Sequence, residues 1–386
     1  MPLREKSKMC QRMEIVRLAI DGDANVTELS RRFKVSRKSV YNWINRYRID
    51  GSNGLVEHST RPLSSPNKTP EKTEALILAL RDSHPRWGAR KLKRRLEDLG
   101  HIWIPNPSTI NEILRRNNRI DLNASCDHTA FKRFECSESN DHWQMDFKGY
   151  FLIADKRCNP LTVLDDHSRY LICLDACCDQ RRTTVMNSLI SAFRRYGLPE
   201  AIVTDNGTPW AVTGSRHDYT RLAIWLMRLG VKLIRSTEYH PQTNGKDERL
   251  HRTLKAEVLQ GRVFKTFEEC QAEFDAWRYV YNFERPHQAL DLDVPSKRYR
   301  MSRRSYPEKL PEIEYGPDVD VRKVQDGGVV YFRGEKYRVS KRFKGQPVAI
   351  RPTIEDGIYE LYFIRQRIRR IDLKNPRIPP GGYPGS

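Results

Sequence analysis

The stretch from His240 to Leu259 limits the possible folds of this chain more than any other, because it joins a turn to a helix of a particular kind. It opens with HPQTNG, in which the proline and the Asn-Gly pair favour tight turns and positive φ angles. Apolar residues then recur every four positions, which predicts one buried face of a helix over residues 244–260. The residues of this face are Leu250, Leu254 and Val258.

Another face of the same helix is charged. Glu248, Arg252 and Lys255 are spaced i, i+4 and i+7, so one carboxylate near the start of the helix stands beside two cations. Oxygen ligands suit a hard metal ion, and Lys or Arg suits phosphate, so the pattern fits a metal ion beside a polyanion. An ordinary helix with a solvated, salt-bridged face explains this segment alone equally well.

Two upstream apolar runs each carry an aspartate. Asp146 lies inside HWQMDFKGYFLI, and Asp205 ends the run in EAIVTDNG. Aspartate is depleted within strands and costly to bury unpaired, which favours a chemical role. A plain turn residue at a strand end is the alternative, and it explains the string Asp-Asn-Gly well on its own. Together with Glu248, the two aspartates make three carboxylates on two predicted strands and a helix.

The residue types, their order and their local context together resemble the metal-binding triad of retroviral integrases and of bacterial insertion-sequence transposases of the DDE type. The resemblance assigns Asp146, Asp205 and Glu248 as catalytic residues and metal ligands, and it implies two Mg²⁺ ions per active site, with Mn²⁺ able to substitute. One departure is visible, since Asp205 and Glu248 are 43 positions apart, several more than the commonest spacing in the family. A loop-like insertion over residues 210–219 is expected to hold the surplus.

The resemblance also implies a reaction and its partners. The reaction is Mg²⁺-dependent cleavage and transfer of DNA strands at the terminal inverted repeats of an insertion sequence, the work of a DDE-type polynucleotidyl transferase. The implied partners are double-stranded DNA of the element ends and the target, and further copies of the chain in a homodimer or larger assembly in the bacterial cytoplasm, at the nucleoid. Two alternatives stay open: a domesticated DNA-binding regulator with an inactive core, and a metal-dependent ribonuclease of the same fold.

The distribution of charge supports a polyanionic partner. The chain has a net charge of +20 over 386 residues. Residues 1–120 carry 25 Lys and Arg against 13 Asp and Glu, residues 301–386 carry 18 against 11, and the middle is nearly balanced at 26 against 25. Basic ends around a near-neutral centre fit a catalytic core flanked by domains that hold DNA.

Cysteines and apolar runs bear on the compartment. The eight cysteines form no CxxC pair and have no regular spacing, which indicates reduced thiols in a cytosolic type of compartment. No apolar run approaches the roughly 20 residues of a membrane span. Residues 1–11 are charged and lack the apolar centre of a signal peptide. We therefore expect no membrane association.

Residues 1–62 are predicted to form a helix-turn-helix domain, with a Ser-, Pro- and Gly-rich linker over residues 51–69. Asn25 and Ser36 are expected to cap the second and third helices. The exposed face of the third helix is predicted to enter the major groove of DNA, and a three-helix bundle with a solvated basic face is the alternative. The residues of that face are Arg37, Lys38, Ser39, Tyr41, Asn42 and Arg46.

Residues 66–120 are predicted to form a second helix-turn-helix domain of winged-helix type, and a purely structural role is the alternative. Its string WGAR resembles a motif at the same place in insertion-sequence transposases. Arg90, Arg115 and Arg116 are expected to contact DNA here. In the catalytic helix, DNA contacts are expected from His251, Arg252 and Lys255.

Residues 141–300 are predicted to form an RNase H-like integrase core that follows a linker at 121–140. Three strands in succession, then alternating helices and strands, give the order of that core. Asp165 and Asp166 are interpreted as structural turn residues, whereas Arg285 and His287 could contact DNA or brace the core. Strands are expected at 143–153, 160–167, 169–175, 200–205 and 231–235, and helices at 181–196, 218–229, 244–260 and 266–282.

The C-terminal part is predicted to be a linker at 301–319, a small five-stranded β-barrel at 320–373 and a disordered tail at 374–386. Short alternating runs separated by Gly-containing turns support the strands. Exposed Arg and Lys of this domain would hold phosphates without reading sequence. The predicted fold class is thus multidomain α+β, with tandem helix-turn-helix domains, an RNase H-like α/β core and a small β-barrel.

Overall fold

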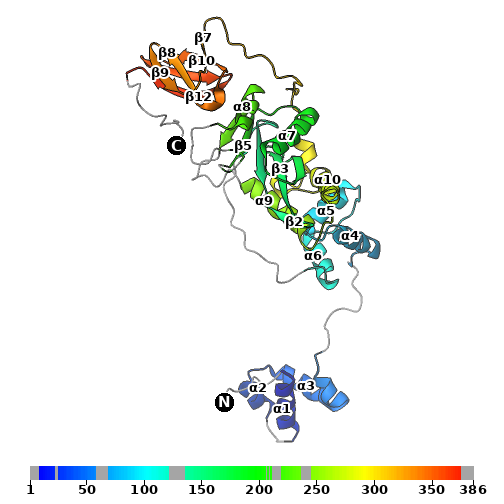
Figure 1. Ribbon diagram of the computed structural model, residues 1–386. Helices are drawn as coiled ribbons and strands as arrows, with labels where there is room; N and C mark the ends of the chain where they lie inside the picture. The colour runs from blue at the N-terminus through cyan, green and yellow to red at the C-terminus, as the bar shows by residue number, and fades with distance from the viewer. Residues whose placement is uncertain are drawn as a thin grey trace. The chain divides into compact units, whose positions relative to one another are not determined.

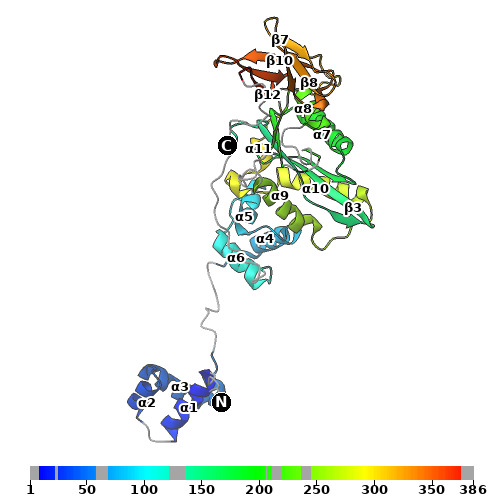
Figure 2. The same ribbon diagram turned by 60° about the vertical axis from the view of Figure 1, so that its left-hand side comes forward.

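The computed structural model describes residues 8–21, 25–57, 68–120, 135–205, 207, 209–210, 219–235 and 245–374. They fall into two compact units, residues 1–68 and 69–386, whose elements are labelled in Figures 1 and 2. In the described ranges, no helix is both long and apolar enough to cross a membrane. The seven cysteines in these ranges are free thiols.

The first unit consists of helices α1 (Lys8–Ile20), α2 (Val26–Arg32) and α3 (Arg37–Asp50). Both predicted caps are confirmed. The Asn25 side chain accepts a hydrogen bond from the Thr27 amide at 2.9 Å, and Ser36 Oγ accepts one from the Ser39 amide at 3.1 Å. The small core between the helices contains Ile15, Val16, Val40, Ile44 and Leu55.

The linker expected from residue 51 begins later than predicted. Gly51–Leu55 forms a 3₁₀ turn, η1, and Leu55 is fully buried against the helices. Arg12 also donates a hydrogen bond to the Leu55 carbonyl at 3.0 Å. A Gly-rich composition is typical of a linker, but one leucine within it completes a core that three short helices leave open.

The second unit begins with α4 (Glu71–Ser83), α5 (Ala89–Asp98) and α6 (Pro107–Arg116). Trp87, from the WGAR string, is buried in their common core and stacks on His84 with 3.9 Å between ring centroids. Residues 68–120 contain no strand, so the wing of the predicted winged-helix type is absent from this segment.

A mixed sheet forms the centre of this unit. β3 (Lys156–Asp165) pairs antiparallel with β4 (Leu171–Cys177) on one side, and with β1 (His142–Phe147) and β2 (Phe151–Ile153) on the other. β1 also pairs parallel with β5 (Ala201–Thr204), which pairs parallel with β6 (Lys232–Arg235). The sheet thus has an antiparallel half followed by a parallel half.

The single strand expected over 143–153 is interrupted in the structure. Phe147 is paired with Leu161, whereas Phe151 is paired with Cys158, so the register moves by one residue between β1 and β2. Gly149 lies in the interruption with φ of +92°, a backbone conformation that glycine adopts without a steric penalty. The apolar pattern of the sequence does not reveal such a shift.

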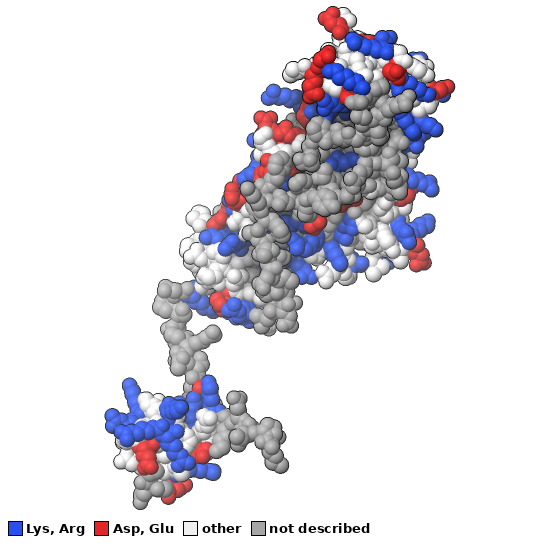
Figure 3. All heavy atoms as spheres, turned by 90° about the vertical axis from the view of Figure 1, so that its left-hand side faces the viewer, with Lys and Arg blue, Asp and Glu red and all other residues white. Residues whose placement is uncertain are grey.

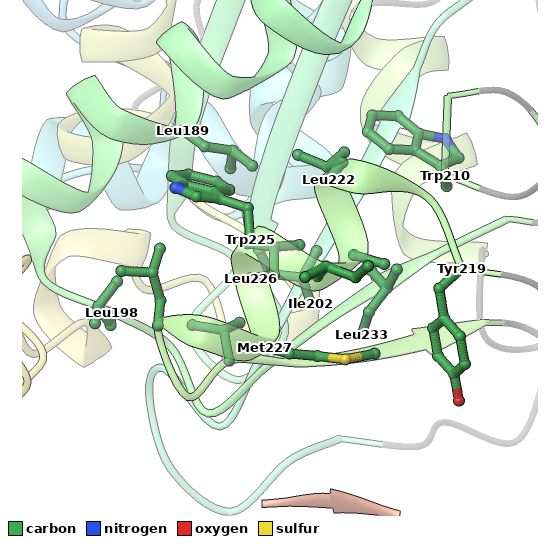
Figure 4. Packing of buried hydrophobic residues seen from close by; sticks show 14 of the residues in the cluster. Leu189, Leu198, Ile202, Trp210, Tyr219, Leu222, Trp225, Leu226, Met227 and Leu233 are labelled. Carbon is green, nitrogen blue, oxygen red and sulfur yellow. The ribbon is translucent and has the colours of Figure 1, made fainter. Parts of the chain in front are cut away.

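Helices cover both faces of the sheet. α7 (Arg182–Tyr196) and α8 (Arg221–Arg228) contribute to the hydrophobic cluster on one face, where Trp225, Leu226 and Leu189 pack together over β5 and β6 (Figure 4). On the other face lie α9 (Gly245–Leu254), the π-helical turn η3 (Lys255–Leu259) and α10 (Phe267–Phe283). The apolar stripe predicted for the helix at 244–260 is confirmed, since Leu250, Leu254 and Val258 are buried.

The predicted linker at 301–319 is attached to the core. The guanidinium of Arg304 donates to the carbonyls of Pro199, Leu229 and Gly230 at 2.7–2.9 Å. Its own carbonyl accepts from the Leu198 amide at 2.7 Å. This segment contains no regular element before residue 320, but side-chain hydrogen bonds fix its path beside α7 and α8.

The C-terminal domain contains six strands, one more than predicted. β7 (Asp320–Lys323), β10 (Pro347–Pro352), β11 (Ile358–Phe363) and β12 (Gln366–Asp372) form an antiparallel sheet in the order β12-β11-β10-β7. β8 (Val329–Phe332) and β9 (Glu335–Arg338) form a separate two-stranded hairpin. A closed barrel is therefore not confirmed. The predicted disordered tail lies, from residue 375 on, outside the described residues.

We expect Leu55→Ala to lower the free energy of unfolding of the N-terminal unit by about 2–5 kcal/mol, because it leaves a cavity in a very small core. Hydrogen exchange of the α1–α3 amides in the full chain measures the loss. Ile49→Ala is the matched control: Ile49 is 79% exposed, and its truncation should change protection by less than about 0.5 kcal/mol. Equal protection in Leu55→Ala and the wild type would contradict the assignment of residues 51–55 to this unit.

Candidate active site

The parallel pairing of β1 with β5 determines where two of the predicted acids lie. Gln144 is paired with Val203, so Asp146 and Asp205, each two residues further on, come to the same edge of the sheet. Side chains alternate between the two faces of a strand. Asp146 and Asp205 therefore share the face that α9 covers.

The third acid acts at the same place. The pKa of Asp146 is raised to about 6, mainly by burial, next by the Asp205 carboxylate, and to a smaller extent by Glu248 on α9. A hydrogen bond from the Phe147 amide, at 2.7 Å, works in the opposite direction. Asp146 is thus a carboxylate whose ionised form is destabilised by two neighbouring carboxylates.

The donor set fits a hard divalent cation, since it consists of carboxylate oxygens with an excess of negative charge. A bound cation would relieve the repulsion that raises the pKa of Asp146. Within the described residues, no three His, Cys, Asp or Glu side chains already meet as ligands of one ion. Asp146 and Asp205 are neighbours at the edge of the sheet, and Glu248 is near enough for its charge to raise the pKa of Asp146.

His251 has a different position from the one expected. It is largely buried beneath the acids, with Nε2 2.8 Å from Thr162 Oγ1 and Nδ1 4.0 Å from Asp146 Oδ2. Burial and the nearby Lys148 ammonium lower its pKa to about 4, so the ring is neutral at neutral pH. The predicted contact of His251 with DNA stays a prediction, and a neutral imidazole would make it without a positive charge.

Cations border the acids on the solvent side. Arg252 and Lys255 are exposed on α9 and η3, as the helical spacing predicted. Lys148, which the sequence analysis missed, follows β1 directly, and its pKa is lowered by partial burial and by the positive charge of Lys255. Its position two residues after Asp146 at the end of an apolar run was the available signal.

Asp247 was also missed. It is 3% exposed, and burial together with the Asp146 and Asp166 carboxylates raises its pKa well above the ordinary value. One of its carboxylate oxygens has no hydrogen-bond partner among the described residues. Its spacing of i, i+3 and i+7 with Leu250 and Leu254 places it on the buried side of α9, a signal that the sequence does contain.

Asp165 and Asp166 have the structural role that was predicted. Asp165 accepts hydrogen bonds from the amides of Asn140 and Ser168 at 2.7 and 2.8 Å. Asp166 accepts from the Cys136 amide at 2.9 Å and from the Gln144 side chain at 2.7 Å. It also forms a buried ion pair with Lys246, from the first turn of α9. The pair fixes the start of the helix that carries Glu248.

Family models match successive parts of the chain. A helix-turn-helix domain matches residues 11–62 and a homeodomain-like domain residues 39–114. An integrase core domain matches residues 137–241, which include Asp146 and Asp205, and again residues 229–295, which include Glu248. The C-terminal domain of IS481 family transposases matches residues 319–379. The resemblance to insertion-sequence transposases is confirmed.

Curated relatives agree with these matches. The insertion element IS407 uncharacterized 31.7 kDa protein of Burkholderia multivorans is 29% identical over 160 residues, which are 41% of this chain and 54% of that protein. The insertion element IS476 uncharacterized 39.2 kDa protein of Xanthomonas euvesicatoria is 26% identical over 253 residues, 63% of this chain and 69% of that protein. The chain thus spans about half of the first relative and about two thirds of the second.

Solved structures with similarity to the chain include two from retroviruses. One is the simian T-cell lymphotropic virus intasome in complex with PP2A regulatory subunit B56 gamma, at 16% identity and a TM-score of 0.35, covering 75% of this chain and 97% of that one. The other is the HTLV-2 integrase catalytic core domain in complex with magnesium, in its trimeric form, at 13% identity and a TM-score of 0.31, covering 42% of this chain and 99% of that one.

The helix-turn-helix residues of this transposase-like chain divide into two groups. Arg37, Lys38, Tyr41 and Asn42 are exposed on α3. The other two predicted residues are engaged within the unit: the Ser39 hydroxyl is 2.9 Å from Ser36 Oγ, and Arg46 donates to the Val56 carbonyl at 2.6 Å.

The predicted DNA-binding arginines of residues 66–120 also differ from one another. Arg90 is exposed at the start of α5. Arg115 pairs with Glu112, and Arg116 pairs with Glu74 while remaining partly exposed. Because exposed ion pairs are weak, neither pairing prevents a contact with phosphate.

Arg285 and His287, for which two roles stayed open, brace the core. Arg285 is 9% exposed and pairs with Glu257 at 3.1 Å. His287 is 8% exposed and packs edge-to-face on Tyr281. Burial and the Arg285 charge lower the pKa of His287 well below its usual value. Neither side chain is placed to reach DNA.

We expect Lys246→Met to lower the free energy of unfolding of the second unit by about 3 kcal/mol, because it leaves the Asp166 carboxylate buried without its counter-ion. Urea unfolding of the full chain measures the change. Arg252→Met, an exposed change on the same helix, should cost less than about 0.5 kcal/mol. Equal losses for the two variants would argue against a supporting role for the buried pair.

Proposed function

We propose that this chain is a DNA transposase that cleaves and joins strands at the terminal inverted repeats of an insertion sequence. The observation that carries the proposal is that Asp146 and Asp205 follow paired strands to one edge of the sheet and that the charges of Asp205 and Glu248 both raise the pKa of Asp146. All three acids lie within segments that match integrase cores. Three carboxylates with cations beside them suit phosphoryl transfer at a DNA phosphodiester. Residues 11–114, which match helix-turn-helix and homeodomain-like domains, would bind the DNA.

In this proposal the three carboxylates hold divalent metal ions, Mg²⁺ in the first place, which supply Lewis acidity for an attacking hydroxyl and a leaving oxygen. The chain's own residues hold and orient the reacting groups. Asp146 and Asp205 extend from rigid strands, which keeps their oxygens in fixed positions. Neutral His251, whose Nε2 lies 2.8 Å from Thr162 Oγ1, packs beside the Asp146 carboxylate.

DNA binding in this proposal is divided between the ends and the centre of the chain. Lys148, Arg252 and Lys255 contact phosphates beside the acids, whereas exposed residues of α3 read the terminal repeat in the major groove. Lys and Arg side chains are abundant on the visible face of the N-terminal unit (Figure 3). Bringing two element ends together requires at least two copies of the chain.

We expect Asp205→Asn to reduce strand cleavage and joining at least 1,000-fold, because the amide removes one negative charge from the acid cluster while keeping its shape. Binding of a terminal-repeat duplex should be unchanged. The measurement is Mg²⁺-dependent nicking and joining of labelled repeat DNA, beside a fluorescence-anisotropy titration.

Asp155→Asn is the matched control, since Asp155 is exposed in the β2–β3 turn and asparagine tolerates its φ of +65°. A variant of Asp205 that still joins DNA ends would exclude the proposed catalytic role. Preferential cleavage of an RNA–DNA hybrid by the wild type would favour a ribonuclease.

We expect Arg37→Ala and Asn42→Ala each to weaken binding of the terminal repeat by about 1–3 kcal/mol and to relax its sequence preference. Arg48→Ala, an exposed change in the last turn of the same helix, should weaken specific binding less and leave the preference intact. Selection of bound sequences from a random pool measures both effects. Unchanged preferences in all three variants would rule out reading by α3.

A further inference from the structure

Helix α5 turns one charged face toward the catalytic core. Lys91, Arg94, Arg95 and Asp98 are spaced i, i+3, i+4 and i+7, which places them on a single stripe of the helix. This stripe lies beside the apolar face of Leu92 and Leu96, which packs within the α4–α6 core. By composition alone, such an Arg- and Lys-rich helix would be assigned to DNA.

Each charge on the stripe faces a core residue of opposite sign. Arg94 Nη2 lies 2.8 Å from Asp293 Oδ1, and Arg95 Nη2 lies 3.0 Å from Glu284 Oε2. The single acid of the stripe, Asp98, pairs with Arg94 of the same helix at 3.1 Å and has Lys297 Nζ of the core at 3.7 Å. Pairing of both arginines with carboxylates across the contact is typical of a specific protein interface.

The remaining residue of the stripe is Lys91. Its ammonium is largely buried, near Glu257 and Arg285, and burial lowers its pKa to about 7. Glu257 accepts hydrogen bonds from Trp277 Nε1 at 2.8 Å and from Arg285 Nε at 3.1 Å. Its side chain and that of Arg285 are each only 11% exposed.

Glu257 lies in η3, which continues α9 without a break in the chain. The widened π-helical turn there marks a change in helical geometry at the end of the segment that carries Glu248. The groups that hold η3 therefore set the axis of α9. Two further contacts join the same parts: Val280 of α10 packs against the α4–α6 core, and Arg86 donates to the Gln260 side chain at 3.3 Å. Figure 2 shows the elements of this part of the chain.

We propose that α4–α6 is a brace that holds α9, and through it Glu248, in the position needed for catalysis. Arg95 and Glu257 are positioning residues of this brace, and the paired arginines of α5 form a protein contact that DNA does not reach. The effect on strand cleavage rests on the proposed function, whereas the effect on the stability of α9 does not.

The test uses charge reversal across the contact in the full-length chain. Arg95→Glu and Glu284→Arg each place like charges together, whereas the double variant restores an ion pair with its direction reversed. Lys93→Glu is the matched control, because Lys93 lies on the same helix and its carboxylate partner at 3.8 Å is Glu97 of that helix. The readouts are hydrogen exchange of residues 246–259, the affinity for a terminal-repeat duplex, and the cleavage rate at saturating DNA.

We expect each single reversal to accelerate exchange in residues 246–259 and to lower the saturating cleavage rate by about 10- to 100-fold, since small misplacements of catalytic groups have effects of this size. DNA affinity should stay within about twofold. The double variant should regain wild-type exchange and most of the cleavage rate, and Lys93→Glu should behave as wild type. Recovery of exchange and cleavage in the double variant would show that the single variants fail because the ion pair is lost, not because the protein is generally less stable.

Three results would overturn the brace: wild-type exchange in both single variants, a double variant no better than the single ones, or recovery on mixing the two single variants, which would place the contact between copies. Should a reversal prevent folding, Arg95→Gln and Glu284→Gln replace it, with faster exchange in residues 246–259 still required. If the wild type cleaves no DNA, the proposed function fails, and hydrogen exchange alone still decides the brace.

Discussion

The parallel pairing of β1 with β5 is the constraint on which the rest of the site depends. It brings two aspartates that are 59 positions apart in sequence to one edge of the sheet, on the face that α9 covers. Burial is the largest cause of the raised pKa of Asp146, and the neighbouring Asp205 and Glu248 carboxylates raise it further. A buried carboxylate beside other carboxylates destabilises the folded protein, so other interactions must keep the strands and the covering helix in place.

Buried polar groups provide many of these interactions. Asp165 and Asp166 accept backbone and side-chain hydrogen bonds that tie the segment before β1 to the β3–β4 turn. Lys246 connects the same turn to the first residues of α9. In η3, which follows α9, Glu257 accepts hydrogen bonds from Trp277 and Arg285. Glu248 is thus carried on a helix whose two ends are both fixed by charged groups inside the protein.

The positively charged side chains of the chain therefore fall into two groups, those exposed to solvent and those with partners inside the protein. Part of it, on α3, faces solvent, where DNA could reach it. Another part, on α5, neutralises acids of the catalytic core, and Arg304 uses its whole guanidinium to fix the segment after the core. Counting Lys and Arg indicates a polyanionic partner, but it does not say which of them meet that partner, because pairing depends on the three-dimensional neighbour.

Local patterns determined most of the elements. Four-residue apolar spacing gave the catalytic helix with its buried leucines, the caps at Asn25 and Ser36 gave the starts of α2 and α3, and the order of the apolar runs gave the mixed sheet. These features follow from nearest neighbours along the chain, so the sequence contains them. The family resemblance of Asp146, Asp205 and Glu248 likewise rests on local strings.

Tertiary structure alone decided how these elements meet. The shift in register at Gly149, the burial of Leu55, the unclosed strands of the C-terminal domain and the neutral His251 beneath Asp146 all depend on residues distant in sequence. The same holds for the protein-facing stripe of α5. A side chain's charge state and partner depend on what folding places beside it, and a linear pattern does not contain that information.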